Sequence, residues 1–100
     1  MFSKREIKLT LFERKVLAAT AKIPLGQTRS YKWVAKQIGN PKAVRAVGQV
    51  LKRNPFLLII PCHRVIREDG SLGDYAGGGA KRKKELLKLE KEIAVSLDKR

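Results

Sequence analysis

Two side chains that can do nucleophilic chemistry, Cys62 and His63, are neighbours in the sequence. They follow Pro61, which fixes one backbone angle, and an apolar stretch from Phe56 to Ile60, so we expect them on a rigid support. A free thiol is mostly protonated near pH 7, and an imidazole that takes its proton supplies the attacking thiolate. Adjacent side chains seldom reach each other, so we expect a water between Cys62 and His63. The alternative is an inert cysteine that only fills the core.

A carboxylate, Glu90, falls inside the apolar stripe of a helix predicted from Ala80 to about Leu97. That stripe consists of Leu86, Leu89, Ile93 and Leu97. At 100° per residue, Glu90 lies only about 40° from Leu86, and an unpaired buried carboxylate would cost several kcal/mol. His63 is the only histidine available as a partner, so a Cys62–His63–Glu90 relay is predicted. The alternative is that Glu90 points to solvent at the edge of the stripe.

Length and composition indicate one compact domain without a disulfide or a structural metal ion. The chain has 100 residues, of which 43% are hydrophobic, with one cysteine and one histidine. These counts exclude an intrachain disulfide and the four ligands of a structural zinc ion, so we expect no metal. No apolar run approaches the roughly 20 residues that cross a bilayer. The N-terminus has no continuous apolar run and so excludes a cleaved secretory signal, and we expect a cytoplasmic protein.

Positive charge dominates the chain and gathers in its middle. The 23 Lys and Arg residues outnumber 9 Asp and Glu residues, which gives a net charge of +14. Every charged side chain from Arg14 to Arg67 is Lys or Arg. Such a surplus attracts the phosphates of a polyanion, and it exceeds what solubility alone requires. It favours a nucleic-acid partner, although charge alone leaves RNA, DNA and an anionic membrane open.

The first two helices are predicted from their caps. Thr10 and Glu13 have the spacing of a capping box, which opens a helix that ends at Ile23–Pro24. Ser30 can cap a second, short helix that ends at Gly39. Apolar residues recur at helical spacing in both: Leu11, Phe12, Val16 and Ala19 in the first, and Tyr31, Val34, Ala35 and Ile38 in the second.

A third helix is predicted directly after the second. Asn40 is a preferred N-cap, Pro41 is a preferred first helical residue, and the pattern continues to about Arg53. Two short helices on a tight turn are typical of a helix-turn-helix. The third helix has an apolar face of Val44, Val47, Val50 and Leu51 and a polar face of Arg45, Gln49, Lys52 and Arg53.

The polar face of this third helix suits a narrow groove. Ala46 and Gly48 are small enough for the backbone to approach a surface closely. A reader of the major groove usually carries several long side chains, and here only Arg45 and Gln49 qualify, which favours the minor groove. The alternative is an ordinary amphipathic surface helix.

The rest of the chain connects these helices to the cysteine. Residues 56–60 predict a buried strand or extended segment, and residues 72–79 form a glycine-rich loop. The basic run at residues 81–84 is interpreted as a solvated face rather than a binding patch. The predicted fold is therefore mainly α: a single winged-helix-like or helix-turn-helix domain, with a short buried extended segment leading to the turn at Cys62.

At these residues the chain resembles the O6-alkylguanine-DNA alkyltransferases. The Pro-Cys-His-Arg-Val string at residues 61–65 is highly specific, and the other strings follow in the family's order and spacing. The matching strings are Ser30–Tyr31, Arg45–Gly48, Asn54–Pro55, Ile60–Val65, Gly73–Gly78 and Leu86–Glu90. The resemblance implies a single-turnover (suicide) DNA-repair methyltransferase that flips O6-alkylguanine out of double-stranded DNA. The alkyl group would move irreversibly to the cysteine without a cofactor, and O4-alkylthymine is a second expected substrate.

The resemblance implies catalytic roles for four residues. Cys62 would be the nucleophile and alkyl acceptor, with His63 its base through a water. Glu90 would orient His63. Tyr31 would press on the 3′ phosphate of the target nucleotide and give its hydroxyl proton to guanine N3, which lets guanine leave as a neutral base.

The resemblance also implies a DNA-binding set and a pocket for the base. Arg45 would enter the base stack in place of the flipped guanine, and Asn54 would tie the helix-turn-helix to the turn at Cys62. The DNA-binding residues would be Tyr31, Arg45, Ala46, Gly48, Gln49 and Lys52. The substrate pocket would be formed by Leu57, Val65, Tyr75, Ala76 and Gly77, with the carbonyls of Cys62 and Val65 accepting from the guanine amine and the Ala76 amide facing O6.

Three departures from the family pattern bear on these expectations. Many relatives have Ser in place of Ala76, where the implied contact uses the main chain, and Pro in place of Leu57, a change expected to reshape the alkyl pocket. Most relatives also carry a preceding domain. We expect residues 1–100 to be a single catalytic and DNA-binding domain without it, monomeric and associated with the nucleoid.

Two other classes of function stay open. An alkyltransferase-like protein would bind alkylated DNA without repairing it, but such proteins lack the acceptor cysteine that this chain has at Cys62. A sequence-specific transcription factor would need a base-reading helix and usually a dimer seam, and the sequence shows neither.

Overall fold

The described part of the chain forms four α-helices, one short 3-10 helix and two short strands. The computed structural model describes residues 9–54, 56, 60–73 and 75–98. In chain order the elements are α1 (Leu11–Ala21), β1 (Arg29–Ser30), α2 (Tyr31–Gln37), α3 (Val44–Lys52), the 3-10 helix η1 (Cys62–Arg64), β2 (Val65–Ile66) and α4 (Gly79–Asp98). The predicted mainly helical domain is confirmed.

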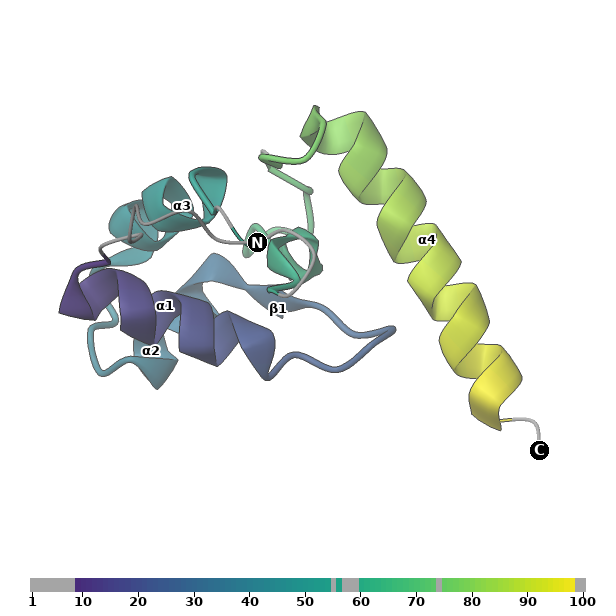
Figure 1. The fold of residues 1–100 in the computed structure, drawn as a ribbon, viewed down its shortest axis with the longest axis horizontal. Helices are drawn as coiled ribbons and strands as arrows, with labels where there is room; N and C mark the ends of the chain where they lie inside the picture. Colours follow the sequence, from purple (N-terminus) through teal and green to yellow (C-terminus); the bar gives the residue numbers. More distant parts are fainter. Residues whose placement is uncertain (1–8, 55, 57–59, 74, 99–100) are drawn as a thin grey trace, which may run out of the picture.

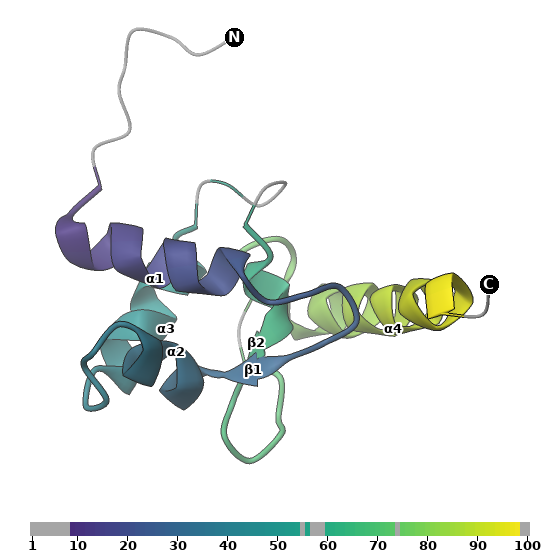
Figure 2. The same cartoon turned by 90° about the horizontal axis from the view of Figure 1, so that it is seen from below.

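Helices α1, α2 and α3 form one group, and the long helix α4 lies apart from it (Figure 1). Between them lie the two strands (Figure 2). The strands are parallel, with Arg29 opposite Val65 and Ser30 opposite Ile66. This pairing places the start of α2, at Tyr31, beside the chain that leaves η1.

The buried core is formed mainly by the three-helix group. Two residues expected on apolar faces are exposed: Leu11 at 67% and Val44 at 37%. Leu11 precedes Val16 by five residues, about 140° around a helix, so the two cannot share a face. Val44 is the first residue of α3. The buried apolar residues are Val16, Leu17, Ala19, Ile23, Val34, Ala35, Val47, Leu51, Cys62 and Val65.

The caps of the first two helices form as predicted. Thr10 Oγ1 accepts from the Glu13 amide at 3.1 Å, and the Glu13 carboxylate accepts from the Thr10 amide at 2.9 Å. Ser30 Oγ accepts from the Trp33 amide at 2.9 Å. Gly39 takes a positive φ of 77° directly after the end of α2.

The predicted start of the third helix at Asn40 and Pro41 is wrong. The Asn40 amide donates to Ala35 O and the Gly39 amide to Lys36 O, both at 3.0 Å, which is the Schellman pattern that closes α2. Asn40 thus belongs to the C-terminal cap of α2, and a turn separates it from α3. That helix begins at Val44 without a side-chain cap.

The predicted buried stripe of α4 is also wrong. Leu89, Ile93 and Leu97 are exposed, at 52%, 40% and 54%. Beyond Gly79 at its start, the residues of α4 that are buried or half-buried are Lys83, Leu86, Leu87, Glu90 and Ala94. The helix is rotated so that two polar side chains face inward.

Close packing at Gly26 fixes the far part of α4. Gly26 has a φ of +82°, and a Cβ added there would lie 2.6 Å from the Ala94 Cβ.

Lys83, predicted to belong to a solvated face, is fully buried. The interpretation of the basic run is therefore wrong for this one residue.

The segment before Cys62 is described only in part. Leu57, Leu58 and Ile59 lie outside the described residues. Phe56 and Ile60 are half-buried and belong to no strand. The Ile60 amide donates to Phe56 O at 2.7 Å. None of the helices described is long and apolar enough to cross a membrane.

Candidate active site

Cys62 is the first residue of η1 and is only 4% exposed. The Cys62 amide donates to Ile60 O at 2.8 Å, and the Arg64 amide donates to Pro61 O at 2.9 Å. Burial raises the pKa of the Cys62 thiol, and the hydrogen bond with Asn54 and the positive charge of Lys83 oppose that rise. The thiol therefore needs a proton acceptor before it can act as a nucleophile.

The contact predicted between His63 and Glu90 is present. His63 Nε2 lies 2.7 Å from Glu90 Oε2, and both side chains are largely buried. His63 Nδ1 is buried and has no hydrogen-bond partner among the described residues. The ring of Tyr75 meets the imidazole edge-on, with centroids 6.0 Å apart.

Arg64 is a member of this cluster that the sequence interpretation missed. Its Nε donates to Glu90 Oε1 and its Nη2 to Glu90 Oε2, each at 2.8 Å, while Nη1 donates to Ile23 O at 2.7 Å. A carboxylate has two oxygens, and His63 satisfies only one of them. The neighbouring arginine, whose fork matches a carboxylate, was the signal that could have identified the second partner.

These partners keep Glu90 ionised. Burial opposes the charge, but the hydrogen bonds from Arg64 and His63, together with the charge of Arg64, outweigh it and lower the pKa of Glu90. An ionised Glu90 can orient His63 and favour the imidazolium that forms when His63 takes a proton.

Asn54 connects the end of α3 to the cysteine turn. Its Nδ2 donates to Ile60 O at 3.2 Å, and its Oδ1 accepts from the Phe56 amide at 2.8 Å. Ile60 O also accepts from the Cys62 amide. The buried Asn54 side chain thus binds the same carbonyl that positions Cys62.

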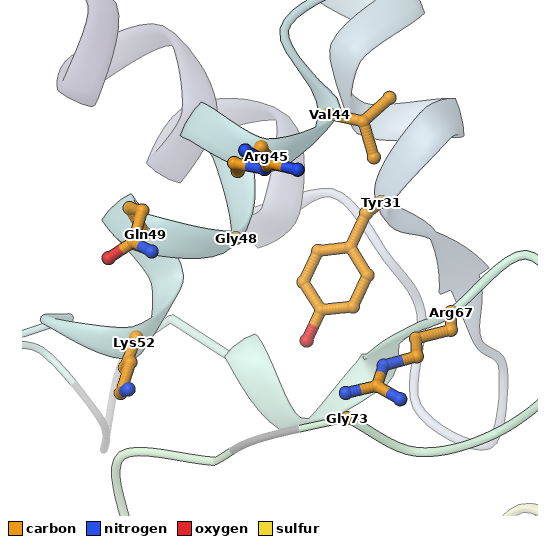
Figure 3. A pocket seen from close by; sticks show the side chains of 8 residues that line it. All are labelled: Tyr31, Val44, Arg45, Gly48, Gln49, Lys52, Arg67 and Gly73. Atoms are coloured by element: carbon orange, nitrogen blue, oxygen red, sulfur yellow. The ribbon is translucent and has the colours of Figure 1, made fainter.

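A hollow of about 550 Å³ lies between α3 and the chain after β2. Tyr31 points across it from the start of α2 (Figure 3). The charged side chains that line it in the described part of the chain are the cations Arg45, Lys52 and Arg67. The remaining lining residues are Val44, Gly48, Gln49 and Gly73. A cationic hollow of this kind suits a phosphate backbone.

Several other predicted site residues that the structure describes do not line this hollow. Ala46 is exposed on α3, and Ala76 is exposed in the loop before α4. Val65 is fully buried in β2. Gly77 lies against the Tyr75 ring, where an added Cβ would be 2.6 Å from the end of that side chain. Leu57 lies outside the described residues. Within the part of the chain described, no three His, Cys, Asp or Glu side chains gather as a metal-binding group.

Comparison with known proteins identifies the family. The family model described as 6-O-methylguanine DNA methyltransferase, DNA binding domain, matches residues 11–92. The chain belongs to this family. The alkyltransferase resemblance drawn from the motifs is therefore confirmed.

Several curated relatives are methyltransferases of about twice the length. The methylated-DNA–protein-cysteine methyltransferase of Mycobacterium leprae is 52% identical over 89 residues, which cover 88% of this chain and 53% of the relative. The constitutive enzyme of Bacillus subtilis is 48% identical over 84 residues, which cover 84% of this chain and 51% of the relative. The chain thus spans about half the length of these methyltransferases.

Solved structures of related proteins include complexes with DNA. Mycobacterium tuberculosis OGT in complex with DNA has a TM-score of 0.81 and 48% identity, over 87% of this chain and 53% of that chain. S. pombe Atl1, in complex with damaged DNA containing O6-carboxymethylguanine, has a TM-score of 0.72 and 32% identity. That match covers 84% of this chain and 79% of Atl1.

In this member of the methyltransferase family, Arg64→Met should destabilise the fold by about 2–4 kcal/mol at pH 7, because it removes one partner of a largely buried ion pair. Above about pH 4.3, where an unfolded glutamate is ionised, the lowered pKa of Glu90 stabilises the folded state. That contribution is lost as the pH falls through the folded-state pKa. The free energy of unfolding of Arg64→Met should therefore differ less from that of the wild type at pH 3 than at pH 7.

Urea unfolding at both pH values measures this difference. Arg14→Met, an exposed change on α1, is the control and should have little effect at either pH. A loss of stability in Arg64→Met that is the same at pH 7 and pH 3 would contradict the ion pair.

Proposed function

We propose that the chain is a single-turnover methylated-DNA–protein-cysteine S-methyltransferase that transfers the alkyl group of O6-alkylguanine in duplex DNA to Cys62. O4-alkylthymine is a second proposed substrate. The observation that carries the proposal is a buried cysteine next to a His63–Glu90–Arg64 cluster, in a member of this family. No cofactor is needed, since the nucleophile and the proton carriers all belong to the chain.

In the proposed reaction, Cys62 Sγ attacks the alkyl carbon, and an S–C bond forms as the C–O6 bond breaks. The electron pair of the broken bond passes to guanine, which takes a proton at N3 from the Tyr31 hydroxyl. The thiol proton passes through a water to His63 Nδ1, because Nε2 is held by Glu90. Glu90 stabilises the resulting imidazolium. The thioether is not reversed, so each molecule reacts once.

The proposed DNA contacts come from α3 and the start of α2. Arg45 enters the stack in place of the flipped base, and Tyr31 presses on the 3′ phosphate. The small residues Ala46 and Gly48 let α3 approach the minor groove, where Gln49 and Lys52 extend the contact. The cationic lining of the hollow supports this assignment.

The proposed base pocket lies on the Tyr75 side of η1. Tyr75 and Gly77 would enclose the base, with Leu57 and Val65 beside the alkyl group. The carbonyls of Cys62 and Val65 would accept from the guanine amine, and the Ala76 amide would face O6. We further propose that the chain acts as a monomer in the cytoplasm, associated with the nucleoid, with its catalytic and DNA-binding residues in one domain.

Recognition of alkylated DNA without repair is the second candidate function. The match to Atl1, which was crystallised with damaged DNA, covers more of that protein than the matches to the methyltransferases cover of theirs. The presence of Cys62 beside His63 in the sequence favours transfer.

Intact-mass measurement after mixing with a duplex containing O6-methylguanine should show the gain of one methyl group on the protein. Cys62→Ala should show no gain and should bind the duplex nearly as tightly, because the groove contacts lie elsewhere. An unchanged wild-type mass together with tight binding would decide for recognition without repair. Methylation of Cys62→Ala would contradict the assignment of the acceptor.

Arg45→Ala should slow transfer from duplex O6-benzylguanine much more than transfer from the free base O6-benzylguanine, since a free base needs no flipping. Single-turnover rates on both substrates measure the two losses. Arg14→Ala removes the same charge from α1 and should affect both rates little. Equal losses on duplex and free base would contradict the role of Arg45.

A further inference from the structure

Trp33, the only tryptophan of the chain, lies on α2 beside a hollow that the proposed reaction does not use. The hollow has a volume of about 330 Å³ and lies between α1 and α2. Trp33 is half-buried, and the guanidinium carbon of Arg29 lies 5.5 Å from the centre of its ring. Arg29 is itself held, because it donates to Gln27 Oε1 and to Thr28 O, each at 2.8 Å. Arg29 does not line the hollow, so it orients the ring and leaves the hollow open.

Two lysines give this hollow a positive charge. Lys15 and Lys22, both exposed, line it from the side of α1, and neither forms an ion pair within the described part of the chain. No Asp or Glu is among the described residues that line it. The other lining residues are Ala18, Ala19, Gln37 and Ile38. The hollow thus combines an aromatic ring, two ammonium groups without a counter-charge and an apolar floor.

A second hollow continues the first along α1. It has a volume of about 310 Å³, and Lys15 and Ile38 line both hollows. Its lining includes a second aromatic residue, Phe12, which is half-buried, and the exposed Leu11. The two hollows therefore form one groove, here called the α1–α2 groove, in which Lys15 is shared between the hollow of Phe12 and the hollow of Trp33.

The α1–α2 groove is separate from the cationic hollow around Tyr31. The two have no lining residue in common within the described part of the chain. On α2, Tyr31 and Trp33 are two residues apart, about 200° around the helix, so their side chains leave it on opposite sides. A ligand in the groove therefore leaves the hollow proposed for duplex DNA free.

We infer that the α1–α2 groove is a second DNA site, which binds an unpaired strand. The bases of a single strand are free to stack on aromatic side chains, while its phosphates pair with cations along a groove. Here one base stacks on Trp33, the next lies against Phe12, and the phosphates beside them pair with Lys15 and Lys22. A free nucleotide would fill only one of the two hollows. The inference goes beyond alkyl transfer and does not depend on it.

The fluorescence of Trp33 reports on the groove directly, because the chain has no other tryptophan. Hexathymidylate should quench it, since a base stacked on an indole quenches its fluorescence. An abasic hexamer, which has the same phosphates, should not. Thymidine monophosphate should need a concentration about tenfold or more higher than hexathymidylate, because it brings only one base. The titrations are made with a saturating short unmodified duplex, which occupies the hollow around Tyr31.

The double variant Lys15→Met/Lys22→Met tests the phosphate contacts. About 0.7 counterions are released per neutralised phosphate of a single strand, so the slope of log affinity against log salt should become less steep by about 1.4. The double variant Lys88→Met/Lys91→Met is the control. It removes the same charge from exposed positions of α4 and should leave the slope nearly unchanged.

Trp33→Leu tests the stacking. The anisotropy of a fluorescently labelled hexathymidylate should show binding about fivefold or more weaker than in the wild type. Circular dichroism checks that Trp33→Leu folds. Because Lys15 and Lys22 are exposed, their double variant keeps the test open if Trp33→Leu does not fold.

Loss of the quenching when the duplex is added, or equal quenching by the abasic hexamer, would overturn the inference. So would a salt slope that is the same in Lys15→Met/Lys22→Met and in its control. Equal affinities for thymidine monophosphate and hexathymidylate would also overturn it, because the groove would then take a free nucleotide. In every case Lys15→Met/Lys22→Met should still gain a methyl group from duplex O6-methylguanine, so failure of this inference leaves the proposed function intact.

Discussion

The carboxylate of Glu90 joins three parts of the chain that are distant in sequence. It accepts from Arg64 and His63 in η1, and Arg64 also donates to Ile23 O after α1. Helix α4 needs this connection, because most of its apolar side chains face away from the other elements. Polar contacts therefore attach α4, supplemented by the close approach of Ala94 to Gly26.

Attachment through charges has a chemical consequence. An apolar interface would hold α4 at least equally well, since hydrophobic packing of the same volume often stabilises a fold as much as a buried ion pair or more. In the proposed reaction one of these charges also serves the chemistry, because Glu90 would orient His63 and favour its imidazolium form. The helix that closes the fold thus also contacts the proposed proton acceptor.

The sequence predicted the contact between His63 and Glu90 and the helical fold, but not every helix boundary or orientation. The caps at Thr10 and Ser30 depend on contacts three residues apart, so local spacing was enough to find them. The helix start predicted at Asn40 was wrong because an Asn can either close the helix before it or cap the helix after it. Only the three-dimensional path of the chain decides between the two. Periodicity alone could not orient α4, since the exposed stripe of Leu89 and Ile93 is more apolar than the face that is buried. Lys83 is one of four consecutive cations, and nothing in the neighbouring sequence shows which of the four is buried.

The central claim is that Glu90 helps Cys62 to form its thiolate. The most direct test is the pH profile of Cys62 reactivity toward a small thiol reagent, measured in the wild type and in Glu90→Gln. The amide keeps the shape but loses the charge that favours the imidazolium, so the thiolate should form at higher pH and the profile should shift upward. Glu92→Gln, an exposed change on the same helix, should leave the profile in place. A Glu90→Gln profile identical to the wild type would contradict the account, because Glu90 would then attach α4 without acting on the cysteine.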